Sequence, residues 1–148
     1  MKTKQTPRLR AKTAYGWLAG VARLILEEPK RYNQELFIRY ARGYQPLSER
    51  FQTSSFPACG TIGCVAGWTA QSRYPDRRIP YSAVSNTACE ILGLTYEQAK
   101  ELFNGSALDS NGEELPPHGS LAYAELGVAH IRRFMKKYSK QLRSTRIK

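Results

Sequence analysis

Cysteine, histidine and tryptophan are scarce in this chain of 148 residues, which holds three, two and two of them. Long apolar runs are also missing, and without a stretch of about 18 apolar residues we expect no membrane span. The basic N-terminus has no apolar signal core, so we expect a cytoplasmic protein. An odd number of cysteines in that compartment predicts reduced thiols. The length is that of one domain, whose core needs no disulfide or metal.

The sequence also lacks the strict alternation of apolar and polar residues that predicts strands, and it has no internal repeat. Apolar residues recur instead in steps of three and four. We therefore predict an all-α fold, a compact single domain of about five to six helices over residues 12–142. A flexible basic arm is expected at 1–11 and a basic tail at 143–148. The predicted helices cover residues 13–28, 33–41, 63–73, 81–92, 95–104 and 120–142.

Glycines and capping residues mark several of these helices. Gly93 suits the left-handed residue that ends a helix. Thr95 and Gln98 fit a capping box at the start of the next one. Gly16 and Gly20 each weaken the first helix by about 1 kcal/mol relative to alanine. In return, we expect them to allow a neighbouring segment to approach closely.

Acidic residues are absent from residues 132–148, which hold eight Lys and Arg. Residues 1–78 hold 14 Lys and Arg against five Asp and Glu, whereas residues 79–131 hold one against seven. The net charge of +11 is therefore concentrated at the two ends of the chain. A chain polarised in this way attracts polyanions. We expect nucleic acid as the partner, with an acidic protein surface as the alternative and a solubilising charge excess as the third interpretation.

Two stretches contain the candidate contacts to nucleic acid. Over residues 31–51, arginines alternate with aromatic residues, and arginine contacts phosphate while exposed aromatic rings stack on bases. From residue 132 onward, basic residues share helix faces. The alternative for both stretches is a solvated surface beside aromatic core residues. The candidate nucleic-acid-binding residues are Arg31, Arg39, Arg42, Tyr44, Arg132, Arg133, Lys136, Lys137, Lys140 and Arg143.

Residues 58–70 hold two of the three cysteines, three of the eleven glycines and one of the two tryptophans. The glycines predict a tight turn into a helix with Thr61 as its N-cap. We favour a packing role for this segment. In that interpretation Cys64 is a small buried hydrophobe, and Trp68 anchors the core.

Three other roles for these cysteines stay open. Cys64 at a helix N-terminus could be a nucleophile, with His118 as its base, in a hydrolase or transferase. His130 is the only other histidine, and the sheet that usually carries such a base is not predicted, so we favour a protein that is not an enzyme. Cys59 and Cys64 could instead bind a metal with Cys89 and a histidine, but their spacing is wider than usual, and we expect no metal or cofactor. A disulfide between Cys59 and Cys64 is the third role.

The pattern Cys59-Gly60-Thr61-x-x-Cys64-x-Ala66-Gly67-Trp68 resembles a motif in small uncharacterised proteins of bacteria and their phages. Residues 28–34 and 91–103 are similar to the segments that precede and follow that motif in the group. The resemblance covers residues 15–138. No function is assigned to that group. A phage accessory or host-interaction protein acting in the host cytoplasm fits the resemblance and the size of the chain, and an inhibitor or adaptor that binds a host protein is a further alternative. The resemblance also implies that one polar pocket is formed by Tyr32, Asn33, Gln34, Cys59, Thr61, Cys64 and Trp68.

Overall fold

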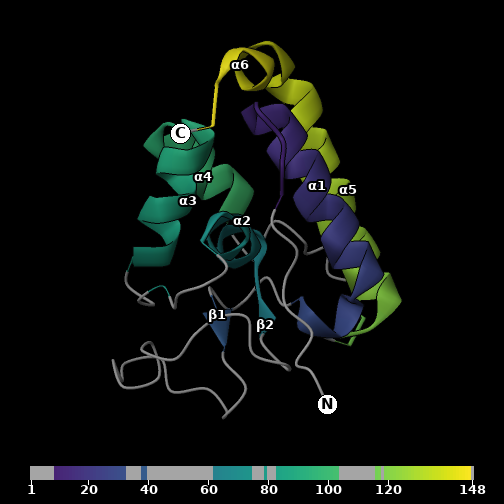
Figure 1. The fold of residues 1–148 in the computed structure, drawn as a ribbon. Coiled ribbons are helices and arrows are strands. Elements are labelled where there is room, and N and C mark those ends of the chain that lie inside the picture. Colours follow the sequence, from purple (N-terminus) through teal and green to yellow (C-terminus); the bar gives the residue numbers. More distant parts are fainter. Residues whose placement is uncertain are drawn as a thin grey trace.

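The computed structural model describes residues 9–32, 38–39, 62–74, 79, 83–103, 116–117 and 119–147. Helices make up most of these segments, as Figure 1 shows, and the predicted all-α class is confirmed. The α-helices are α1 (Ala14–Glu27), α2 (Val65–Arg73), α3 (Val84–Leu92), α4 (Tyr96–Phe103), α5 (Leu121–Lys137) and α6 (Ser139–Ser144). A 3-10 turn, η1 (Pro29–Arg31), follows α1, and two short strands, β1 (Ile38–Arg39) and β2 (Ile62–Gly63), pair with each other.

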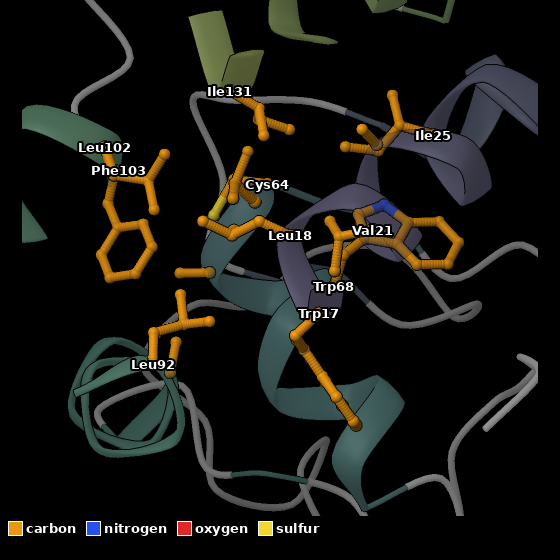
Figure 2. Close-up of a cluster of buried hydrophobic side chains, with 14 of the residues drawn as sticks. Trp17, Leu18, Val21, Ile25, Cys64, Trp68, Leu92, Leu102, Phe103 and Ile131 are labelled. Atoms are coloured by element: carbon orange, nitrogen blue, oxygen red, sulfur yellow. The ribbon is translucent and has the colours of Figure 1, made fainter. Parts of the chain in front are cut away.

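The core lies between two layers of helices. Helix α1 runs alongside α5 on one side of the molecule, and the α3–α4 pair lies on the other side (Figure 1). Helix α2 lies between them, and all its residues except Arg73 are buried. Figure 2 shows apolar side chains from the first five helices meeting around α2. Each fully buried Leu or Ile contributes roughly 1.5–3 kcal/mol relative to an exposed one.

Helix α1 agrees with its predicted range to within a residue at each end. Thr13 is the N-cap, and its hydroxyl accepts a hydrogen bond from the backbone N–H of Gly16 at 3.2 Å. The helix ends at Glu27, just before Pro29, because proline cannot continue the hydrogen-bonding pattern. Trp17 extends from α1 to α2, where its ring N–H donates to the carbonyl of Thr69 at 3.3 Å. This bond fixes the crossing of the two helices.

The two glycines of α1 lie under the chain segment that leads into the helix. A methyl group added at Gly20 would come within 2.9 Å of the Leu9 side chain, and one at Gly16 within 3.1 Å of the Ala11 side chain. Leu9 is buried there. The close neighbour expected from the glycine spacing is therefore the chain's own N-terminal segment.

The turn between α3 and α4 follows the sequence signals closely. Gly93 ends α3 with φ 64° and ψ 37°, in the left-handed region that favours glycine. Thr95 and Gln98 form the predicted capping box: the backbone N–H of Thr95 donates to Gln98 Oε1 at 2.9 Å, and the backbone N–H of Gln98 donates to Thr95 Oγ1 at 3.2 Å. Helix α3 begins at Val84, later than the predicted residue 81.

The single helix predicted over residues 120–142 is divided in two at Tyr138, so the prediction of one continuous helix was wrong. Ser120 caps the start of α5 by accepting from the backbone N–H of Tyr123 at 3.1 Å. Tyr138 then leaves the helical conformation, and its hydroxyl donates to Glu101 Oε2 at 2.6 Å. The change of direction brings α6 against α1, where Leu142 is fully buried. The buried apolar residues Ala124, Val128, Ile131 and Phe134 lie on α5, and Leu142 lies on α6.

Two further predictions of local structure were wrong. The helix predicted over 33–41 is not helical at Ile38–Arg39, which form strand β1 and pair antiparallel with Ile62–Gly63. That pairing holds the backbone extended up to Gly63, so α2 cannot start where the glycines suggested. It starts at Val65 with Cys64, rather than Thr61, as its N-cap. Thr61 lies outside the described residues.

Candidate nucleic-acid interface

The described segments near the two ends of the chain, residues 12–14 and 145–147, meet beside the N-terminus of α1. Thr13 and Arg146 form an isolated antiparallel bridge. The backbone N–H of Ala14 donates to the carbonyl of Thr145 at 2.8 Å, and that of Ile147 donates to the carbonyl of Lys12 at 2.9 Å. The expected arm at 1–11 and the expected tail at 143–148 are therefore neighbours in the part of each that is described.

A groove of about 340 Å³ opens beside this bridge. Among the described residues that line it, half are Arg or Lys and none is acidic: Leu9, Arg10, Ala11, Lys12, Trp17, Arg73, Arg146 and Ile147. Arg10, Lys12 and Arg146 are exposed and make no ion pair with any other described residue. Three segments that are distant in the sequence thus supply positive charge to one concave surface.

The groove residues were not among the candidates predicted from the sequence. Arg10 and Lys12 lie within or beside the stretch assigned to the arm, and Arg146 lies within the tail, so the net charge pointed to both stretches. Nothing local indicated that the two stretches pair. Arg73 was expected only as the end of a helix, which is its position in α2.

The basic residues of α5 and α6 form a second positive surface. Arg132, Arg133, Lys136 and Lys140 are exposed, and within the described segments none of these four has an ion-pair partner. Arg143 connects this surface to the chain ends. Its guanidinium lies 3.7 Å from the ring centre of Tyr15, close to the start of α1, and its Nε donates to Ser139 Oγ at 3.0 Å.

Lys137 is exposed but already has an anionic partner. Its ammonium lies 2.8 Å from Glu101 Oε1 on α4, and Tyr138 donates to the other oxygen of the same carboxylate. The hydrogen bond from Lys137, followed by that from Tyr138, lowers the pKa of Glu101 below its ordinary value. Much of the charge of Lys137 is therefore matched within the fold.

Arg31 lies at the edge of the core rather than on the surface. Its side chain is 11% exposed, and Nη1 lies 2.9 Å from Glu28 Oε2. The guanidinium also lies over the ring of Trp68, 5.2 Å from its centre. Of the other candidates between residues 31 and 51, Arg39 lies in β1, and Arg42 and Tyr44 are outside the described residues.

Cys64 is completely buried at the N-terminus of α2, where Figure 2 shows it among core side chains. Burial raises the pKa of its thiol to about 11, although backbone N–H groups at the helix start, Gly67 first, act in the opposite direction. It is a free thiol, so the Cys59–Cys64 disulfide is not formed. An activated thiolate needs a partly exposed site whose surroundings lower the thiol pKa. Cys59 and His118 lie outside the described residues.

His130 contacts backbone carbonyls at the end of α4. It is buried on α5, and its Nε2 lies 3.0 Å from the carbonyl oxygen of Glu101 and 3.1 Å from that of Leu102. Burial lowers its pKa, while the two carbonyls act in the opposite direction. Cys89, on α3, is partly buried and donates its thiol proton to the carbonyl of Leu94 at 3.3 Å. Among the residues that the structure covers, no three His, Cys, Asp or Glu side chains gather to hold a metal.

Tyr32, Cys64 and Trp68, three members of the expected polar pocket, are all buried. The Trp68 ring N–H donates to the carbonyl of Arg31 at 3.2 Å. The Tyr32 ring packs 5.4 Å from that of Tyr123, centre to centre. These three residues therefore belong to the packed core. The other four expected members, Asn33, Gln34, Cys59 and Thr61, are not among the described residues.

Comparisons with protein-family models, with curated proteins and with solved structures find no match for this chain. Within the described segments, none of the helices has the length and apolarity needed to cross a bilayer.

Proposed function

We propose that this protein binds nucleic acid through phosphate contacts along a basic surface, which we define as the exposed cations of α5 and α6 together with those of the groove. One observation carries the proposal: the bridge between Thr13 and Arg146 joins the described parts of the two basic end segments, residues 9–13 and 143–147, at one place. Without that contact the positive charge would be divided between two separate ends. With it, a polyanion can contact both at once.

The cations on this surface favour binding to nucleic acid of any sequence over sequence-specific recognition. Seven of them are exposed and make no ion pair with other described residues: Arg10, Lys12, Arg132, Arg133, Lys136, Lys140 and Arg146. Lysine and arginine contacts to phosphate fix position and affinity but carry no base information. If about five phosphates are neutralised on a duplex, the logarithm of the affinity should fall with the logarithm of salt concentration with a slope of about −4.5.

An exposed acidic side chain on α3 supports one orientation. Glu90 on α3 is exposed, and α3 lies away from α5 in Figure 1, whereas α4 contacts α5 through Glu101. A polyanion would be repelled from that side and attracted to the basic surface. Following the resemblance described above, we propose an accessory role for this protein in a phage or bacterial cell, in the cytoplasm.

The test is the affinity for mixed-sequence single-stranded and duplex oligonucleotides, measured by fluorescence anisotropy over a series of salt concentrations. Lys136→Glu with Lys140→Glu should weaken binding at least tenfold and reduce the slope by about 2. The matched control is Arg23→Glu with Lys100→Glu, which changes the net charge equally at exposed positions on α1 and α4. Equal losses in both variants, or no binding at low salt, would contradict the proposal.

A further inference from the structure

The groove between the chain ends differs from the rest of the basic surface because it is concave and small. Its volume of about 340 Å³ is near the lower end of the 300–1,000 Å³ that is typical of small-ligand pockets. We infer that this groove holds a phosphomonoester, either at the end of a single strand or on a free nucleotide. The strand-end form of this inference rests on the nucleic-acid binding proposed above.

The cations around the groove suit a compact anion with a high charge. Arg10 and Lys12 come from the N-terminal segment, Arg146 comes from the C-terminal segment across the bridge, and Arg73 comes from the end of α2. A phosphomonoester carries about −1.5 to −2 charges at neutral pH and has three acceptor oxygens. A phosphodiester within a strand carries one charge and has two free oxygens. Guanidinium groups bind phosphate oxygens in pairs, so the two exposed arginines, Arg10 and Arg146, favour the monoester.

The groove is formed without help from a ligand. Leu9 is buried against Gly20, which holds the N-terminal wall on α1. The wall across from it is held by the backbone hydrogen bond from Ile147 to Lys12. A site already in its binding conformation loses little affinity to ordering.

Recognition in this groove should depend on the phosphate and little on the base. Trp17 is the aromatic residue in the lining, but it is 2% exposed and its ring N–H is bonded to the carbonyl of Thr69. A ring in that position cannot offer a face for a base to stack on. The other lining residues within the described segments are cations or aliphatic side chains.

The first experiment needs only the unmodified protein. Oligonucleotides of one sequence are compared with a 5′-phosphate, with a 3′-phosphate and with hydroxyls at both ends, with the fluorophore placed internally. At least one phosphorylated form should bind about tenfold more tightly, which is the effect of about one charge-assisted hydrogen bond. Equal affinities for the three forms would overturn the inference and leave the proposed function standing. No binding of any of them would count against the proposed function.

Adenosine monophosphate separates the two sources of the phosphomonoester. If the groove takes strand ends, the nucleotide should compete with the phosphorylated strand and leave the hydroxyl-ended strand bound. If it binds while no strand does, the groove is a nucleotide site and the proposed function fails. If it neither binds nor competes, the phosphomonoester site is contradicted.

Variants locate the effect in the groove. Arg10→Ala with Arg146→Ala should reduce the tenfold preference to about one, with little change for the hydroxyl-ended strand. Both side chains are exposed, so a large loss of stability is not expected. Arg132→Ala with Arg133→Ala, on α5, should weaken all three strands by the same factor. A preference that survives the groove substitutions would place the phosphate elsewhere and overturn the assignment.

Discussion

Thr13 and Arg146 pair with each other, and this contact makes the C-terminal segment part of the fold. The pairing satisfies the backbone N–H of Ala14, the first residue of α1, through the carbonyl of Thr145 at 2.8 Å. Thr145 also packs against Gly93, where an added methyl group would come within 2.7 Å of its side chain. The last residues thus connect α1 with the α3–α4 turn.

Deleting residues 145–148 should lower the free energy of unfolding by about 2–3 kcal/mol. Two backbone hydrogen bonds are lost, each with a net contribution of about 1 kcal/mol, and the helix start loses a partner. Urea unfolding followed by circular dichroism measures the effect. Deleting Lys148 alone is the control and should leave the midpoint unchanged. If both deletions leave it unchanged, the bridge does not contribute to stability.

Gly127→Ala should destabilise the protein by about 2–3 kcal/mol, because a methyl group there overlaps the buried ring of Tyr32. The ring also packs against Tyr123, so it has little room to move. Thermal unfolding of the variant measures the loss.

Gly20→Ala is the matched control for that substitution. Its methyl group meets only the end of the Leu9 side chain, which can rotate, and alanine adds about 1 kcal/mol of helix propensity. The control should therefore be close to neutral. Similar losses at the two positions would mean that Tyr32 does not fill the space at Gly127.

Local signals predicted the helices well where neighbours in sequence decide the structure. The N-cap at Thr13, the left-handed Gly93 and the Thr95–Gln98 capping box each involve residues within three or four positions. The break at Tyr138 was not predictable, because its cause is Glu101 on another helix. The start of α2 was misplaced for the same kind of reason: β2 pairs with β1, a segment distant in sequence.

The candidate site, too, could be predicted from the sequence only in part. The charge distribution pointed to both ends of the chain, and Arg132, Arg133, Lys136 and Lys140 are exposed. The pattern could not show which cations are already paired within the fold, as Arg31 is with Glu28. It also could not show that the two ends form one groove, because that depends on the bridge at Arg146.

Cys64 should react with iodoacetamide more slowly than Cys89 in the folded protein. Cys64 is completely buried with a thiol pKa raised to about 11, whereas Cys89 is partly exposed. Labelling near pH 8 followed by peptide mass spectrometry gives the rate at each residue. In urea both should react at similar rates, which is the control. Faster labelling of folded Cys64 at pH 6 would restore the nucleophile hypothesis.

His130 should make the free energy of unfolding depend on pH. Its pKa is lowered mainly by burial, with Arg133 acting in the same direction and Glu101 in the opposite one. Below pH 6.5, the ordinary pKa of histidine, the unfolded chain therefore binds a proton more readily than the folded protein does. The free energy of unfolding should fall as pH falls through this range. Above it, the imidazole is neutral in both states and the contribution is fully present.

The measurement is the urea midpoint between about pH 8 and pH 5.5, a range above the titration of Glu101, whose pKa is lowered. His130→Gln keeps an N–H donor for the carbonyls of Glu101 and Leu102 but does not titrate, so its midpoint should change much less over this range. His118→Gln removes the only other histidine and should leave the slope in place. If the slope disappears in the His118 variant and persists in the His130 variant, the burial of His130 is not its cause.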